Sequence, residues 1–150
     1  MIYIPKYFKP EELLDRATWT KFGIVGLRYF HPRILAALDF IREVYPTSTG
    51  VRRIAVNDAA HQWRGLRSPA CPEYKPHSGH SFGAAVDFTP AGITCEEMRK
   101  WILNLHADVT REGHTDHPIL GIRRMEIGTT TWVHIDCLET DSNAITMVNH

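Results

Sequence analysis

Two separated stretches of the chain carry side chains of the types that bind metal ions. Residues 78–87 read SGHSFGAAVD, and a run of glycine and alanine separates the loop residue His80 from the strand residue Asp87. Such small residues let neighbouring elements pack closely and leave space beside the two ligand-type side chains. Residues 132–137 read WVHIDC and alternate as a strand does, with His134 on one face. If that face meets the first stretch, two imidazoles and one carboxylate converge.

This combination of donors is typical of catalytic zinc, which takes three protein ligands and keeps one open position. His80, Asp87 and His134 therefore predict a Zn²⁺ site. The chain contains 9 histidines in 150 residues, which makes a metal site worth looking for. Asp136, on the same strand face as His134, and Ser78 are expected to hold or orient the ligands without touching the metal.

The elements that must position these residues are signalled by periodicity and capping. Apolar spacing, an early proline and a Thr94/Glu97 capping box predict helices over residues 10–14, 32–45 and 94–105. Strands are expected at residues 53–57, 83–88, 119–127 and 131–137, the last two paired around Gly128. Residues 58–82 predict a long irregular segment, and such segments in compact domains are often functional.

These elements indicate an α+β domain. Helices come early, strands come late and no βαβ rhythm appears, which favours a mainly antiparallel sheet flanked by helices. No repeat, low-complexity tract or flexible linker divides the 150 residues, so we expect one small domain over residues 1–150. The three cysteines contain no Cys-x-x-Cys pair, and we expect them to be buried apolar residues.

Composition argues against several classes of function. The chain has 17 basic and 17 acidic residues, so its formal net charge is zero, which is atypical of proteins that bind nucleic acid. No segment has the length of a transmembrane helix, so we expect no membrane insertion. The first residues lack a basic stretch followed by an apolar one, so we also expect no secretory signal.

The two ligand stretches resemble a known family. Residues 80–87 fit the pattern His-x-x-Gly-x-Ala-x-Asp, and residues 134–136 fit His-x-Asp. Both are similar to motifs of the zinc D-Ala-D-Ala carboxypeptidase and peptidoglycan endopeptidase family, which includes many phage endolysins. Residues 65–68 (GLRS) look like the Gly-Tyr-Arg-Ser element of that family. The matching motifs fall within residues 54–137 and occur in the family's order.

The resemblance implies a fold and a set of residue roles. The family shares the Hedgehog/DD-peptidase fold, so that fold is expected here. Its zinc ion would be held by His80, Asp87 and His134. The arginine of the Gly-Tyr-Arg-Ser element helps to bind the substrate peptide in the family, which implies that role for Arg67.

One position departs from the family pattern. Many relatives carry Glu, Asp or His as a general base a few residues before the last zinc histidine, whereas residues 128–133 (GTTTWV) contain none of these. Glu126, on the neighbouring expected strand, is the first candidate for this base. The alternatives are loop side chains, namely His114, Asp116, His117 and, as a weaker option, His77.

The resemblance therefore implies a zinc peptidase that hydrolyses peptide bonds in bacterial peptidoglycan, as a D,D-carboxypeptidase or an endopeptidase. Without a secretory signal, such an enzyme would be made in the cytoplasm. It would reach the cell wall after release or within a virion, with phage particle or lysis proteins as further partners. The unassigned base leaves an alternative, a catalytically inactive zinc-containing module that binds the cell wall or belongs to a virion. A peptidase for other peptides is the third reading.

Overall fold

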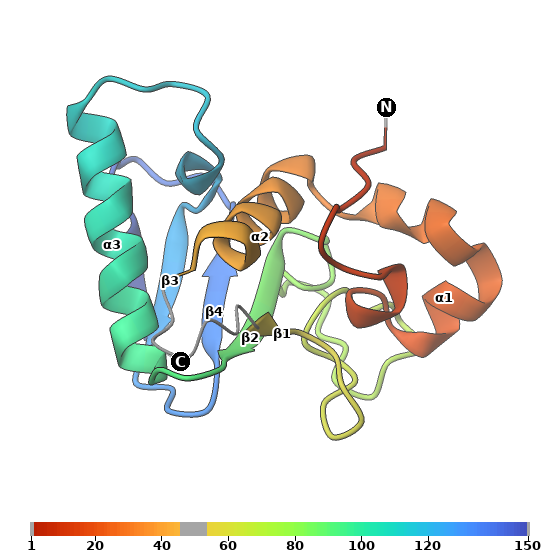
Figure 1. Cartoon of the computed structure of the whole chain (residues 1–150). Coiled ribbons are helices and arrows are strands. Elements are labelled where there is room, and N and C mark those ends of the chain that lie inside the picture. Colours follow the sequence, from red (N-terminus) through yellow and green to blue (C-terminus); the bar gives the residue numbers. More distant parts are fainter. Residues whose placement is uncertain (1, 46–53, 150) are drawn as a thin grey trace.

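A five-stranded sheet organises the computed structural model, which describes residues 2–45 and 54–149 (Figure 1). In chain order the strands are β1 (Ile54–Ala55), β2 (Ala85–Pro90), β3 (Arg124–Ile127), β4 (Val133–Asp136) and β5 (Thr146–Asn149). Across the sheet they lie in the order β1-β2-β4-β3-β5. Neighbouring strands pair antiparallel except β3 and β5, which are parallel, so the sheet is mixed.

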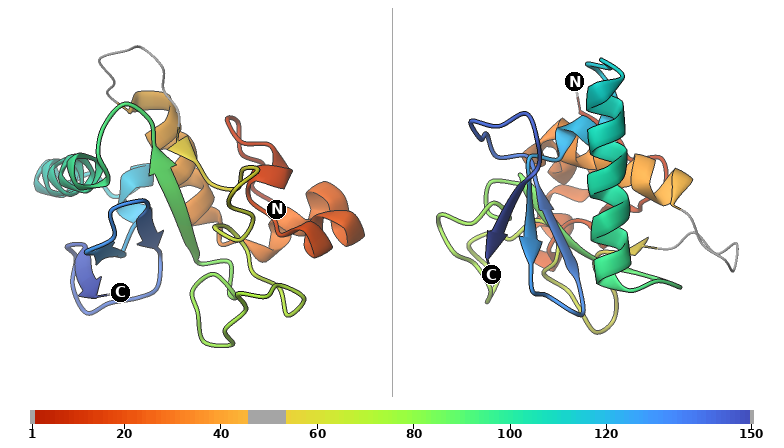
Figure 2. Two further views of the ribbon diagram at one scale, coloured as in Figure 1. Left: turned by 90° about the horizontal axis from the view of Figure 1, so that it is seen from below. Right: turned by 90° about the vertical axis from the view of Figure 1, so that its left-hand side faces the viewer.

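Two long helices, α2 (Pro32–Val44) and α3 (Cys95–Arg111), cover one face of this sheet, as the two views of Figure 2 show. The shorter helices are η1 (Pro10–Glu12), α1 (Arg16–Phe22), η2 (Gly23–Tyr29) and η3 (Pro118–Gly121). Within the described ranges, no helix combines the length and the apolar composition that crossing a membrane requires. The molecule is thus an α+β domain whose two long helices lie against a sheet.

The hydrophobic core lies between the sheet and these two helices. Ile34, Leu38 and Ile41 recur at helical spacing along α2 and are completely buried. Val86 of β2 and Ile135 of β4 belong to the same buried cluster. Burying one such side chain is worth about 1.5–3 kcal/mol. Since side chains alternate along a strand, the residues between these apolar ones point to the opposite face of the sheet.

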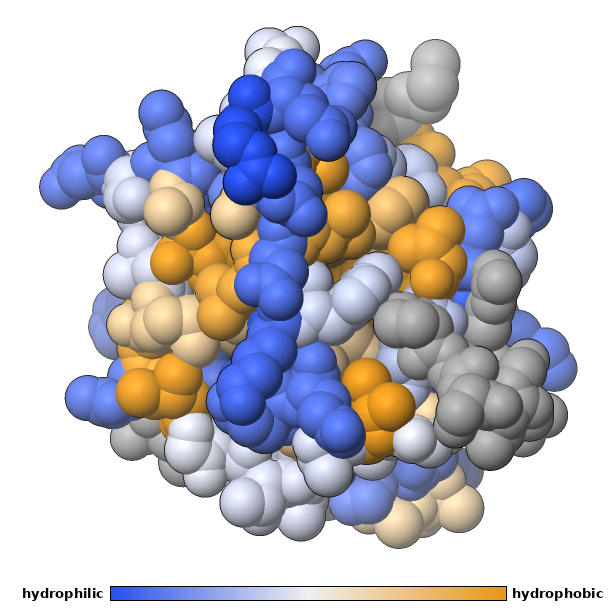
Figure 3. Space-filling model, turned by 60° about the vertical axis from the view of Figure 1, so that its left-hand side comes forward, coloured by the Kyte–Doolittle hydropathy of each residue, from blue (hydrophilic) through white to orange (hydrophobic). Residues whose placement is uncertain are grey.

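The expected capping box begins α3. The Thr94 hydroxyl accepts a hydrogen bond from the backbone N–H of Glu97 (3.1 Å), and the Glu97 carboxylate accepts one from the backbone N–H of Thr94 (2.8 Å). Arg99, buried in this helix, donates to the backbone carbonyls of Glu126 (2.9 Å) and Trp132 (3.1 Å). The helix is thereby fastened to β3 and to the start of β4. Figure 3 shows the outward side of α3 as a hydrophilic ridge flanked by apolar side chains.

Several expected elements are confirmed with shifted ends. They are the helices over residues 32–45 and 94–105, the strands over 83–88 and 131–137, and the irregular segment 58–82. Of the strand expected at residues 53–57, only β1 is seen among the described residues. Arg53 lies outside the described residues. The three cysteines are buried, as expected, and they are free.

Other expectations need correction. In place of the helix expected over residues 10–14, Pro10–Glu12 form a short 3₁₀ helix. The strand expected over 119–127 begins instead as η3, whose first residue is Pro118. Proline has no N–H to donate to a sheet, and its fixed φ suits the first turn of a helix. Helix α1 was not expected, although Asp15 signals its start by accepting a hydrogen bond from the backbone N–H of Thr18 (3.0 Å). Strand β5 was not expected either, and its parallel pairing makes the sheet mixed.

Candidate metal centre

Strands β2 and β4 bring two of the expected ligands together. In their antiparallel register Asp87 lies directly opposite His134, so both side chains leave the same face of the sheet. The completely buried neighbours Val86 and Ile135 fix this register, because a slip by one residue would turn them out of the core. As a result, Oδ1 of Asp87 lies 2.7 Å from Nδ1 of His134.

His80 reaches the same place from the irregular segment. Its side chain is buried, and its Nδ1 lies 2.9 Å from the backbone carbonyl oxygen of Gly65. Gly83 makes this approach possible, since its φ is +65° and a Cβ there would lie 1.9 Å from the carbonyl oxygen of Tyr29. The glycine between His80 and β2 therefore serves close packing of two backbone segments.

The three side chains form one group beside the sheet. One ligand atom from each of His80, Asp87 and His134 lies within 4.8 Å of the other two. Nε2 of His80 is 3.3 Å from Oδ2 of Asp87, and the two imidazole centroids are 5.2 Å apart. Over residues 2–45 and 54–149, no other set of three His, Cys, Asp or Glu side chains gathers as closely. The structure thus brings together the three residues that the sequence singles out.

Hydrogen bonds around the group leave suitable lone pairs for a cation. A carbonyl oxygen only accepts hydrogen bonds, so Nδ1 of His80 carries the proton and donates it to Gly65. The lone pair of Nε2 is then free to bind a metal ion. Nε2 of His134 lies 3.4 Å from Oδ2 of Asp136, which leaves Nδ1 to face Asp87. A carboxylate or carbonyl on the far nitrogen is how proteins usually orient metal-binding imidazoles. The group could therefore hold a metal ion, and its donors fit a site for zinc.

Asp136 is itself held firmly behind His134. Its buried carboxylate accepts hydrogen bonds from Nε of Arg124 (2.9 and 3.0 Å) and from the backbone N–H of Leu138 (3.0 Å). Burial raises the pKa of Asp136, but the hydrogen bonds from His134 and Arg124 outweigh it and keep that pKa below its ordinary value. Sequence reasoning missed Arg124. The available signal was its parity with Glu126, which puts both on one face of β3.

The electrostatics of the group are dominated by mutual pairing. Burial disfavours the charged form of Asp87, but its hydrogen bonds with His134 and His80 hold the pKa of the carboxyl well below its usual range. Burial alone would lower the pKa of His134, whereas its hydrogen bonds with Asp136 and Asp87 raise this pKa to about 9. In the metal-free protein at neutral pH, a protonated imidazole therefore sits between two carboxylates. A divalent cation would take over the charge of that proton.

Arg67 and Ser78 support the other two ligands. One guanidinium N–H of Arg67 donates to Oδ2 of Asp87 (3.1 Å), and its Nε donates to the backbone carbonyl oxygen of Trp63 (2.6 Å). The Ser78 hydroxyl accepts a hydrogen bond from the backbone N–H of His80 (3.3 Å). Arg67 therefore holds Asp87 in place, and Ser78 steadies the turn that carries His80.

A cleft of about 850 Å³, called the metal cleft below, opens over the group of His80, Asp87 and His134. Its volume is near the upper end of the range for small-molecule sites. His80, Asp87, His134, Arg67 and Ser78 all line it, together with the indoles of Trp63 and Trp132. Glu126 also borders this cleft. Arg124 lies opposite Asp136 in the β3–β4 register, so Glu126, two residues further along β3, leaves the same face of the sheet as His134.

The loop candidates for a general base lie elsewhere. His114, Asp116 and His117 line a separate hollow of about 520 Å³ and do not border the metal cleft. Nδ1 of His117 accepts a hydrogen bond from the backbone N–H of Ile119 (3.2 Å), so this imidazole caps η3. His77 is exposed and does not line the cleft. Of the sequence-predicted candidates for the base, Glu126 is the one that borders the cleft.

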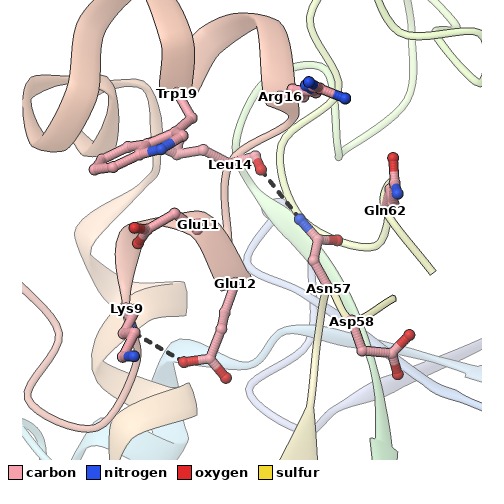
Figure 4. Close-up of a pocket in the computed structure, with 9 residues that line it drawn as sticks. All are labelled: Lys9, Glu11, Glu12, Leu14, Arg16, Trp19, Asn57, Asp58 and Gln62. Carbon is pink, nitrogen blue, oxygen red and sulfur yellow. Dashed lines mark hydrogen bonds between the residues drawn. The ribbon is translucent and has the colours of Figure 1, made fainter. Parts of the chain in front are cut away.

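A smaller hollow of about 320 Å³ adjoins the metal cleft, and Gln62 lines both. Figure 4 shows this hollow between the Trp19 indole on one side and Gln62 on the other. Asn57 on its wall donates a hydrogen bond to the backbone carbonyl oxygen of Leu14 (3.1 Å). The charged side chains that line this hollow are of both signs, for example Arg16 and Asp58. The two hollows are therefore neighbours on either side of Gln62.

Comparisons of the chain with protein-family models, with curated proteins and with solved structures give no match. What the site does is therefore argued from its own residues and geometry.

Proposed function

We propose that this protein is a zinc peptidase that hydrolyses peptide bonds in bacterial peptidoglycan. The observation that carries the proposal is the meeting of His80, Asp87 and His134 at an open cleft. Two imidazoles and one carboxylate are a ligand set of zinc peptidases, and the cleft leaves room for a substrate beside them. The sequence motifs at these residues add the family, its Hedgehog/DD-peptidase fold and the cell-wall substrate to the proposal.

In this proposal the ligand set and its supports prepare the site for attack by water. Zinc, when bound, lowers the pKa of a coordinated water towards neutrality and polarises the scissile carbonyl. Asp136 fixes the ring of His134, while Arg67 fixes Asp87, so the ligands need little rearrangement. Arg67 also borders the cleft, where the family resemblance assigns it a contact with substrate.

Glu126 is the proposed general base. It borders the cleft from β3 and leaves the same face of the sheet as His134. Its carboxylate would accept a proton from the attacking water and then return it to the amine of the departing peptide. This assignment accounts for the absence of an acid or histidine in residues 128–133, because the base comes from the neighbouring strand.

The direct test is digestion of purified peptidoglycan and soluble muropeptides by the zinc-loaded protein, with fragments identified by mass spectrometry. We expect products in which one peptide bond has gained one water, and we expect none with a His134→Ala variant. His114→Ala, which removes an exposed imidazole outside the cleft, is the matched control and should keep full activity.

The outcomes separate the alternatives. Stoichiometric zinc with no cleavage, but with measurable binding to peptidoglycan, would select an inactive wall-binding or virion module. Cleavage of L-peptides in place of muropeptides would select a peptidase of other substrates. Failure of the native protein to bind zinc at all would overturn the proposal.

A further inference from the structure

The basic side chains around the metal cleft are not equivalent. Four of them line it, namely His61, Arg64, Arg67 and Lys75, apart from the two ligand imidazoles. Arg67 is paired with Asp87, and His61 with Asp58 at 3.0 Å. Arg64 is buried and donates a hydrogen bond to the Thr89 hydroxyl (2.6 Å). Three of the four are thus already engaged by acceptors of the protein itself.

Lys75 differs from them. It is exposed, and no ion pair or hydrogen bond joins its ammonium group to any described residue. Its backbone, in contrast, is anchored to the loop around His80. The carbonyl oxygen of Lys75 accepts hydrogen bonds from the Ser78 backbone N–H (3.0 Å) and the Ser81 hydroxyl (2.8 Å). Those two residues flank the turn that carries His80. The backbone of Lys75 is therefore fixed beside the turn that carries His80, and its exposed side chain lines the cleft.

With a divalent ion bound at the ligand group, the charges of the cleft would favour an anionic substrate. Arg64, Arg67 and Lys75 are balanced in number by the acidic residues Glu73, Asp87 and Glu126. A divalent ion at the ligand group would make the total positive. Within the described part of the chain no ion pair links Glu73 to Lys75, although both border the cleft. The added positive potential would therefore act together with the ammonium group of Lys75 on a carboxylate of the substrate.

We infer that Lys75 determines specificity, by binding a carboxylate that the peptide substrate carries near its scissile bond, and that Arg67 is a positioning residue for Asp87. The inference rests on the proposed function and names the residue that would recognise the substrate's charge. A lysine on an exposed turn suits this task because its ammonium group offers three donors and its stem adapts to the ligand. Arg67, held at both Nε and one terminal nitrogen, has its charge already compensated.

The test uses two peptides that differ only in one group, a carboxylate in the first and a carboxamide in the second, each cut by the zinc-loaded protein. We expect the native protein to prefer the carboxylate by about 10-fold or more in kcat/KM, the size expected of a charge-assisted hydrogen bond. Lys75→Ala should abolish this preference through a higher KM for the carboxylate peptide, with kcat little changed. Lys75→Arg should keep it. Lys100→Ala, which removes an α3 lysine outside the cleft, is the matched control.

Two further measurements separate the roles. Calorimetric titration of metal-free protein with the carboxylate peptide should show weaker binding by Lys75→Ala than by native protein. Arg67→Gln should weaken zinc binding but leave the preference for the carboxylate. A preference that survives in Lys75→Ala and disappears in Arg67→Gln would overturn the inference, as would a native protein that does not distinguish the two peptides. If the native protein cut peptidoglycan and yet showed no such preference, only the inference would fail; no cleavage of any peptide would instead defeat the proposed function.

Discussion

At the scale of single residues, the position of His134 between two carboxylates determines how the binding of a cation would depend on pH. Asp87 approaches one ring nitrogen and Asp136 the other, and together they favour the imidazolium form in the absence of metal. A metal ion has to displace that proton. Metal binding should therefore release a proton and become tighter as pH rises through the neutral range.

Asp136→Asn tests the support behind His134. The amide keeps the shape of the side chain but removes the charge that orients the imidazole, so zinc affinity should fall by about 10–100-fold. Competition with a chromophoric chelator measures this, and circular dichroism checks that the fold is retained. An unchanged zinc affinity would mean that Asp136 serves only to hold Arg124.

Glu126→Gln tests the proposed base. Because the amide cannot take a proton from water, kcat/KM should fall by about 10²–10⁴-fold while the zinc content stays the same. Glu112→Gln, at an exposed acid outside the cleft, is the control. Native activity in the Glu126→Gln variant would mean that another group in the cleft acts as the base.

At the scale of elements, the turn between His80 and β2 depends on a glycine that meets two demands at once. Gly83 and Gly113 both have positive φ (65° and 77°), but only Gly83 lies against another backbone segment. Gly113→Ala should cost about 1–2 kcal/mol of unfolding free energy, which is the penalty for a left-handed conformation. Gly83→Ala should cost more, because its Cβ would meet the carbonyl oxygen of Tyr29.

Urea unfolding of the two variants makes this comparison. The Gly83→Ala variant should also bind zinc more weakly, since the displaced turn carries His80. Equal losses of stability, with unchanged zinc binding, would show that the turn relaxes away from Tyr29 without consequence for the site.

At the scale of the whole molecule, the buried imidazole of His106 makes stability depend on pH. His106 lies on the packed side of α3, and its Nε2 has no hydrogen-bond partner among the described residues. Burial, with a contribution from the positive charge of Arg123, lowers the pKa of His106 below its ordinary value. The unfolded chain then binds more protons than the folded one once pH falls below about 6.5.

Above about pH 6.5 His106 is neutral in both states and does not reduce the free energy of unfolding. As pH falls from there toward the lowered pKa of the folded state, the free energy of unfolding decreases. His106→Leu should flatten the decline of unfolding free energy between about pH 6.5 and pH 5. Both proteins are compared in the presence of a chelator, so that the titration of the ligand histidines cancels. Identical pH profiles would show that His106 is not the residue responsible.

Local sequence patterns determined much of this molecule. The spacing of Ile34, Leu38 and Ile41 defines α2, and the Thr94/Glu97 pair defines the start of α3, because helical spacing and capping involve residues a few positions apart. The alternation of Val133, His134 and Ile135 likewise defines the two faces of β4. The three ligand-type residues could be chosen from the sequence for the same reason, since their spacing and small neighbours are local features.

The tertiary structure alone decided how distant segments meet. Only the register of β2 with β4 places Asp87 opposite His134, and only the parallel pairing of β5 with β3 makes the sheet mixed. The engagement of Arg67 by Asp87 and the exposure of Lys75 over the same cleft also depend on contacts across many residues. Such contacts are fixed by packing of the whole core and by loop closure, for which a single sequence carries no local periodic signal.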